Sequence, residues 1–232
     1  MCGRFSLISP EEILARLFKL NDVPPIAPRY NIAPSQAVPG VIFSAGKKEN
    51  QLAFFRWGLI PAWTKDATRC AKSINACSET VFEKAAFRVP ILRRRCLIPA
   101  DGFFEWKKTK GEKQPYFIRL KGEQTFAFAG IWERWQGTPE APVESCAILT
   151  TAANNLIQPL HERMPVILPP EDYGAWLDPE NQKAENIQPM FRPYPANAME
   201  ALAVGDWVNS AAHDGPRCIE VREDETEDLF SF

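Results

Sequence analysis

The segment CLIPADGFFEWK at residues 96–107, followed by PYFIRL at 115–120 and TFAFAGIWER at 125–134, decides the fold class of this chain. β-Branched and aromatic residues fill these segments, and glycine, proline or charged residues separate them, as is typical of strands joined by turns. Similar segments predict further strands at 36–43, 52–59, 146–151 and 165–168. We therefore expect an α+β fold, with a mostly antiparallel β-sheet or an open barrel and a few flanking helices.

Three helices are expected beside these strands. The first begins with SPEE at residues 9–12, where Ser9 is the predicted N-cap and proline takes the first helical position. Its apolar stripe consists of Ile13, Leu14, Leu17 and Phe18. A second helix is predicted over 78–87, ending before Pro90, and a third over 170–177.

The chain has 232 residues, which is within the range of one domain with its own hydrophobic core. We expect that domain to span 1–222, followed by an acidic C-terminal tail at 223–232. The net charge is only -2, so the overall electrostatic field does not attract nucleic acid. Any affinity for DNA must come from local groups of basic residues.

Cysteine and histidine usage argues against a bound metal. The six cysteines form no C-x-x-C pair, and there are only two histidines, His161 and His213. We expect no metal and no cofactor, and most of the thiols should be buried in the core of a protein from a reducing compartment. No apolar run is long enough to span a bilayer and the start lacks the pattern of a secretory signal, so a cytoplasmic location is expected.

Cys2 carries the first chemical signal. A small second residue normally permits removal of the initiator methionine, which would leave Cys2 as the N-terminal residue. Its α-amine and thiol then form a 1,2-aminothiol, with ordinary pKa values near 8 and 8.5. With an aldehyde, the amine can form a Schiff base and the thiol can close onto the same carbon to give a thiazolidine. The competing interpretation is an ordinary buried cysteine.

Six motifs occur in a fixed order along the chain: MCGRF (1–5), RYNIAP (29–34), WGLIP (57–61), INACSET (74–80), ADGFFEW (100–106) and LHERMP (160–165). Together they make the chain resemble the SOS-response-associated peptidase family, whose members are abasic-site processing proteins. The resemblance extends from Met1 to about Val208.

The resemblance implies a DNA-damage response function. It matches Cys2 to the family's crosslinking cysteine, Asn75 to the asparagine that orients it, Glu105 to the acidic residue and His161 to the active-site histidine. In the family, removal of Met1 exposes Cys2, which forms a thiazolidine with the ring-opened sugar of an abasic site in single-stranded DNA. Related activities are β-elimination at the abasic site and slow reversal of the crosslink. The resemblance thus implies hydrolase, protease and lyase activities in the SOS response, and association with the nucleoid when DNA is bound.

Each of these assignments has a structural alternative. Asn75 precedes a predicted helix, so it is equally suited to cap it. Glu105 lies among aromatic residues that would raise its pKa, yet strand alternation could place it on a solvent face. His161 is a candidate for proton transfer because imidazole suits that role, although a lone histidine is usually structural. The DNA-binding candidates are Arg4, Trp63, Trp106 and Arg163, which could instead be exposed arginines and core tryptophans.

Two positions depart from the family pattern. Cys77 stands where relatives typically have an arginine, and Ala85 where some have another. The loss of two cations from a phosphate track should weaken DNA binding and flatten its dependence on salt. Nearby cations that could compensate are Lys72, Lys84, Arg88 and the RRR run at 93–95.

Two other functions compete with this interpretation. An N-terminal-nucleophile amidohydrolase also begins Met-Cys-Gly, but such enzymes normally continue with an apolar residue and carry an Asn-Gly element, whereas this chain has Arg4 and no Asn-Gly. A noncatalytic single-strand binder would use its aromatic residues as stacking platforms, but the sparse cations argue against it.

Overall fold

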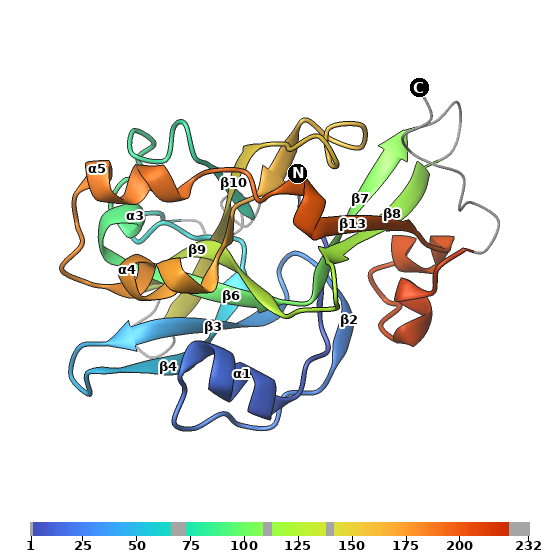
Figure 1. Ribbon diagram of the computed structural model, residues 1–232. Helices are drawn as coiled ribbons and strands as arrows, with labels where there is room; N and C mark the ends of the chain where they lie inside the picture. The colour runs from blue at the N-terminus through green and yellow to red at the C-terminus, as the bar shows by residue number, and fades with distance from the viewer. Residues whose placement is uncertain (1, 66–72, 109–112, 138–141, 223–232) are drawn as a thin grey trace.

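The computed structural model describes residues 2–65, 73–108, 113–137 and 142–222. These residues form two β-sheets with short helices around them (Figure 1). The expected α+β class is confirmed, and most strand pairs are antiparallel. Among the described residues, no helix is both long and apolar enough to cross a membrane.

The first sheet has the strand order β13-β8-β7-β1-β2. Its strands are β13 (Met199–Ala203), β8 (Lys113–Leu120), β7 (Gly102–Lys108), β1 (Phe5–Leu7) and β2 (Arg29–Ile32). The N-terminal strand β1 thus lies inside the sheet, between β7 and β2.

The second sheet has the order β11-β10-β4-β3-β6-β9-β12, with β5 paired to β10. Its strands are β11 (Arg163–Pro165), β10 (Val143–Ala152), β4 (Glu49–Trp57), β3 (Ala37–Ser44), β6 (Arg95–Ala100), β9 (Phe126–Trp135), β12 (Ile167–Leu168) and β5 (Asn75–Cys77). β10 also pairs with β9, and it runs parallel to both β4 and β5.

The helical elements are short. The α-helices are α1 (Glu11–Phe18), α3 (Pro90–Arg93), α4 (Tyr173–Leu177) and α5 (Ala184–Ile187); the 3₁₀ turns are η1 (Pro170–Asp172), η2 (Gln188–Met190), η3 (Ala196–Ala198), η4 (Asp206–Asn209) and η5 (Pro216–Ile219). The helix expected over 170–177 is present as η1 followed by α4. In α1, Leu14 and Phe18 are buried, as the apolar stripe predicts.

Two helix predictions were wrong in detail. Ser9 does not cap α1, whose N-cap is Pro10 without a side-chain hydrogen bond, because the Ser9 hydroxyl donates to Asp101 Oδ1 at 2.7 Å. No helix forms over 78–87, where the backbone makes a series of turns. The Ser78 N–H donates to the Thr150 carbonyl, so this segment leaves β5 still paired to β10, and α3 begins at Pro90 instead.

The segment 96–107, expected as one strand, is two strands that belong to different sheets. The chain passes from β6 to β7 at Asp101 and Gly102. A side chain at Gly102 would lie 2.3 Å from the Phe117 ring and 2.9 Å from the Ile118 carbonyl, so only glycine fits this crossing. The crossing places β7 beside β1 and so brings Glu105 to the N-terminus of the chain.

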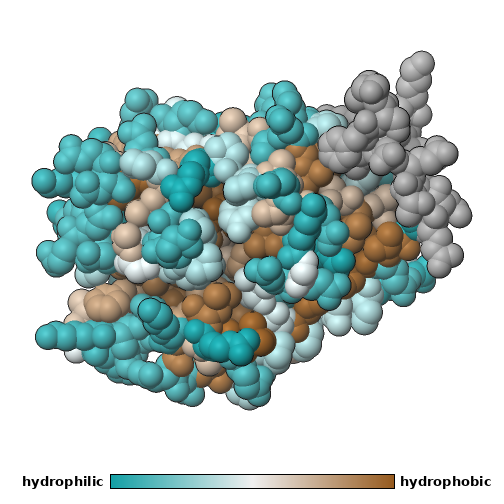
Figure 2. Space-filling view, viewed as in Figure 1, coloured by the Kyte–Doolittle hydropathy of each residue, from teal (hydrophilic) through white to brown (hydrophobic). Residues whose placement is uncertain are grey.

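The two sheets share one hydrophobic core. Phe5 of the first sheet makes edge-to-face contacts with Trp57 and Phe128 of the second, with ring centroids 5.1 and 5.7 Å apart. A smaller cluster, containing Phe104, Phe117, Val204, Val208 and Cys218, joins the first sheet to the C-terminal 3₁₀ turns. Figure 2 shows one face of the molecule, where apolar side chains emerge between hydrophilic ones.

Candidate active site

Cys2 lies three residues before the start of β1 and is completely buried. Pairing of Phe5 with Phe103 and Ile32 fixes this strand on both sides. The Cys2 thiol is 3.8 Å from the Arg4 carbonyl oxygen, a weak hydrogen bond. Burial raises the pKa of the Cys2 thiol well above its usual range, and the nearby charge of Glu105 raises this pKa further. The thiol is therefore protonated at neutral pH.

Glu105 is brought to Cys2 by the antiparallel pairing of β7 with β1. The Phe104 N–H donates to the Arg4 carbonyl at 3.0 Å, so the next residue along β7 lies beside the start of the chain. Glu105 is only 4 % exposed, and the alternative of a solvent-facing carboxylate is therefore wrong. Burial raises the pKa of its carboxyl group, while the proximity of His161 opposes this rise.

Asn75, which lies in the second sheet, also contacts Cys2. It begins β5, and its Nδ2 donates a hydrogen bond of 2.9 Å to the Cys2 carbonyl. Its Oδ1 is buried and accepts no hydrogen bond from the described residues. Asn75 is not a helix cap, since β5 leads into turns.

His161 follows a turn at the approach to β11, and its backbone N–H donates to the Ile157 carbonyl at 2.9 Å. Its Nδ1 accepts a hydrogen bond of 2.9 Å from the Arg163 backbone N–H. A nitrogen that accepts cannot also carry the proton, so the neutral imidazole holds its proton on Nε2. The backbone of β11 therefore selects one tautomer of His161.

Arg163 is held by several partners rather than left open to solvent. Its guanidinium binds Glu79 through two hydrogen bonds of 2.7 and 2.8 Å, and it donates to the Thr150 carbonyl at 2.6 Å. These bonds from Arg163 lower the pKa of Glu79 to about 2. Cys77 adjoins this pair, with its Sγ 2.7 Å from Glu79 Oε2 and 3.3 Å from Arg163 Nη2.

The arrangement thus joins Cys2, Asn75 and Glu105, from three separate strand regions, with His161 electrostatically coupled to Glu105. Comparison with known proteins agrees with the six sequence motifs. A family model described as SOS response associated peptidase (SRAP) matches residues 1–211. The chain belongs to the SRAP family.

Its relatives carry consistent names. The abasic site processing protein YoqW of Bacillus subtilis (strain 168) is 43% identical, over 95% of this chain and 99% of YoqW. YoaM, an abasic site processing protein of the same organism, is 40% identical over 95% of this chain and 98% of YoaM. A crystal structure of a protein from Bacteroides thetaiotaomicron is similar with a TM-score of 0.84 and 30% identity, over 95% of this chain and all of that one.

The other candidate DNA-binding residues of this SRAP chain differ in their exposure and in their contacts. The Arg4 guanidinium donates to Asn31 Oδ1 at 2.8 Å and to the Val208 carbonyl at 2.9 Å, contacts that fix the start of the chain. Trp106 is half-buried and donates from Nε1 to Asn209 Oδ1 at 2.7 Å. Trp63 is 67 % exposed. As DNA-binding residues, these three and Arg163 remain predictions.

The SRAP site also contains a residue that sequence reasoning missed. Glu79 is the partner of Arg163, and its place in the INACSET motif was the available signal.

Ala85 is exposed in the turns that follow. Of the possible compensating cations, Lys72 lies outside the described residues, as does the acidic tail. The described residues contain no group of three or more His, Cys, Asp or Glu side chains that could hold a metal ion.

Proposed function

We propose that this protein senses abasic sites in single-stranded DNA and captures them as a covalent thiazolidine through Cys2, after removal of Met1. The observation that carries the proposal is the convergence of Asn75 and the buried Glu105 on Cys2 at the start of the chain. The names of the relatives, abasic site processing proteins, support the substrate.

The chemistry follows from the aminothiol. Once Met1 is gone, the Cys2 amine adds to the C1′ aldehyde of the ring-opened sugar, and loss of one water gives an imine. The thiol sulfur then bonds to the imine carbon while the thiol proton moves to the imine nitrogen, which closes the thiazolidine. One C–N and one C–S bond form, and one water leaves.

The surroundings of Cys2 set the order of these steps. Since burial keeps the thiol protonated, the amine is the first nucleophile and the sulfur reacts only when the imine is already beside it. Asn75 Oδ1 is an acceptor suited to orient the amine without supplying a charge. His161, with its proton on Nε2, can donate to the sugar oxygen as the ring opens.

Glu105 is suited to transfer protons in removal of Met1, in β-elimination and in crosslink reversal. Burial raises the pKa of this carboxyl above its usual range, which suits it both to take and to return a proton. We assign it the general-base role in hydrolysis of the Met1–Cys2 bond, a peptidase-like reaction, and the proton transfers of β-elimination and crosslink reversal. These activities belong to a DNA-damage response in the cytoplasm, at the nucleoid.

A denaturing gel tests the central claim. Mature protein incubated with single-stranded DNA that carries one abasic site should give a heat-stable adduct, whose intact mass equals protein plus DNA minus one water. Cys2→Ala should give none, and retention of a residue before Cys2 should also abolish the adduct. Cys77→Ala, a second thiol close to the site, is the matched control and should crosslink. An equal yield from Cys2→Ala would overturn the mechanism.

A further inference from the structure

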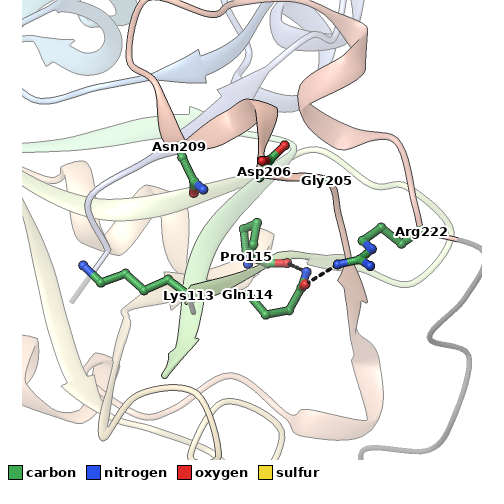
Figure 3. Close-up of a pocket in the computed structure, with 7 residues that line it drawn as sticks. All are labelled: Lys113, Gln114, Pro115, Gly205, Asp206, Asn209 and Arg222. Carbon is green, nitrogen blue, oxygen red and sulfur yellow. Dashed lines mark hydrogen bonds between the residues drawn. The ribbon is translucent and has the colours of Figure 1, made fainter. Parts of the chain in front are cut away.

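A polar cavity of about 530 Å³ lies between the start of β8 and η4 (Figure 3). Its lining consists of Lys113, Gln114, Pro115, Gly205, Asp206, Asn209 and Arg222, and we call it the η4 pocket. The volume lies within the usual range for small-molecule sites, roughly 300–1,000 Å³. None of the proposed catalytic groups lines this pocket.

The wall of the η4 pocket is nevertheless tied to the active site. Asn209 accepts a hydrogen bond from Trp106 Nε1 through its side chain, and its backbone carbonyl accepts one of 3.4 Å from Arg4 Nη2. Trp106 follows Glu105 directly, and Arg4 lies two residues after Cys2. Trp106 also pairs with Pro115 in the sheet, so these two side chains share a face. The pocket therefore lies on the Trp106 face of β7 and β8, next to the strand that carries Glu105.

Within the pocket, one cation is held in a defined position. Gln114 Nε2 donates to the carbonyls of Pro115 and Val204 at 2.8 and 2.9 Å, which leaves its Oε1 to accept. Arg222 Nη1 donates to that oxygen at 2.8 Å (Figure 3). The amide thus orients the guanidinium at the rim of the pocket.

The charges of the pocket favour an anion. Lys113 and Arg222 form no ion pair within the described parts of the chain, whereas Arg29, Arg94, Arg119, Arg163 and Arg192 each have a carboxylate partner. Asp206 also lines the cavity, so the local balance is one positive charge. On a protein of net charge -2, two cations around one cavity, without a carboxylate partner among the described residues, are a local attraction for phosphate.

We propose that the η4 pocket holds one nucleotide of the strand that flanks the abasic site, with its phosphate bound by Lys113 and Arg222. The inference rests on the proposed function, since the ligand is part of the same DNA. Trp106 and Arg4, which both contact Asn209, connect the wall of the pocket to the strands that lead to Glu105 and Cys2. The pocket fixes which side of the lesion the protein grips.

The test uses Lys113→Gln and Arg222→Gln with single strands that carry a tetrahydrofuran abasic analogue, which has no aldehyde and permits only noncovalent binding. Because both cations bind the same phosphate, the double variant should lower the slope of log affinity against log salt by about 0.7, the contribution of one phosphate, and each single variant by no more than that. The loss should occur with DNA extended on one side of the lesion and vanish when that arm is removed. Arg16→Gln, an exposed arginine of α1, is the matched control and should bind as wild type.

Crosslinking rates separate this inference from the proposed function. At saturating DNA with a true abasic site, both variants should crosslink at the wild-type rate, and unchanged thermal midpoints would show that they are folded. A wild-type slope in the double variant, or equal losses whichever arm is removed, would overturn the η4 assignment while crosslinking stands. Binding of a free deoxynucleoside monophosphate as tight as that of the strand would also overturn it. Absence of crosslinking in the wild-type protein would instead overturn the proposed function.

Discussion

At the level of single side chains, the Glu79–Arg163 pair controls much of the candidate site. It joins the turn after β5 to β11, and the Arg163 backbone fixes the tautomer of His161. The guanidinium predicted to bind phosphate already has a bidentate carboxylate partner, so phosphate must compete with Glu79 for it.

The two acid-base groups should have separable effects on rate. Glu105→Gln should slow Met1 removal and crosslink reversal, because the amide cannot accept a proton. His161→Ala should slow adduct formation by roughly 100-fold, the lower end of general acid-base contributions. Single-turnover rates of all three reactions decide this, and rates equal to wild type in both variants would leave the two residues structural.

Glu105 should also make stability depend on pH. Its pKa in the folded protein is raised above the ordinary 4.5, so the folded state binds its proton more tightly than the unfolded state does. The stabilisation is complete below pH 4.5 and is lost as the pH rises through the folded-state pKa. Glu105→Gln should remove this loss, so its thermal midpoint relative to wild type should increase from acidic to neutral pH. A constant difference between the two proteins would contradict the raised pKa.

Cys77 offers a direct test of DNA affinity. An arginine there would lie beside both Glu79 and Arg163, and would either contact phosphate or draw Glu79 away from Arg163. In both cases Cys77→Arg should steepen the slope of log affinity against log salt by about 0.7 and tighten noncovalent binding. The crosslinking rate at saturating DNA should stay unchanged. Cys77→Ala controls for loss of the thiol, and an unchanged slope in Cys77→Arg would show that position 77 does not face the DNA.

At the level of secondary structure, the crossing between β6 and β7 positions Glu105 beside the start of the chain. Gly102→Ala should destabilise the protein by about 1–3 kcal/mol, the usual cost of overpacking, because the new methyl group meets the buried Phe117 ring and the Ile118 carbonyl. Gly174→Ala in α4 is the control, since nothing lies within 4 Å of the added atom, and it should be neutral or slightly stabilising. Chemical denaturation measures both, and equal midpoints would contradict the crowding at Gly102.

The strands with strong local patterns were predictable from the sequence, and the shortest ones were not. Residues 115–120 and 125–134 alternate or run apolar over enough positions to identify β8 and β9. The three residues of β5 are too few for a pattern, and their pairing with β10 depends on contacts more than 70 residues away. Ser9 is a residue type that often caps helices, but its hydroxyl donates instead to Asp101, a residue distant in sequence.

The residues of the candidate site could be named from the sequence, but the hydrogen bonds and ion pairs between them could not. The motifs supplied Cys2, Asn75, Glu105 and His161, but the bond from Asn75 to Cys2 links residues 73 positions apart. The ion pair of Arg163 with Glu79 likewise spans 84 positions. No periodicity in the sequence encodes such pairs: the first arises when the two sheets pack together, and the second when β5 and β11 both pair with β10.

For the whole molecule, the attraction of DNA depends on local groups of cations rather than on the net charge. With a net charge of -2, long-range attraction of DNA is weak, and binding must depend on a few cations near the lesion. Raising the salt concentration should therefore cost this protein less affinity than a strongly basic DNA-binding protein.

The central position of β1 has a consequence for the life of the chain in the cell. β1 is held between β7 and β2, and Phe103, the partner of its residue Phe5, is synthesised almost a hundred residues later. Until then Cys2 is accessible on the nascent chain; in the folded protein its side chain is buried. Under the proposed function, we therefore expect a separate aminopeptidase to act chiefly during translation, whereas a chain that folds with its methionine in place would depend on Glu105 for maturation.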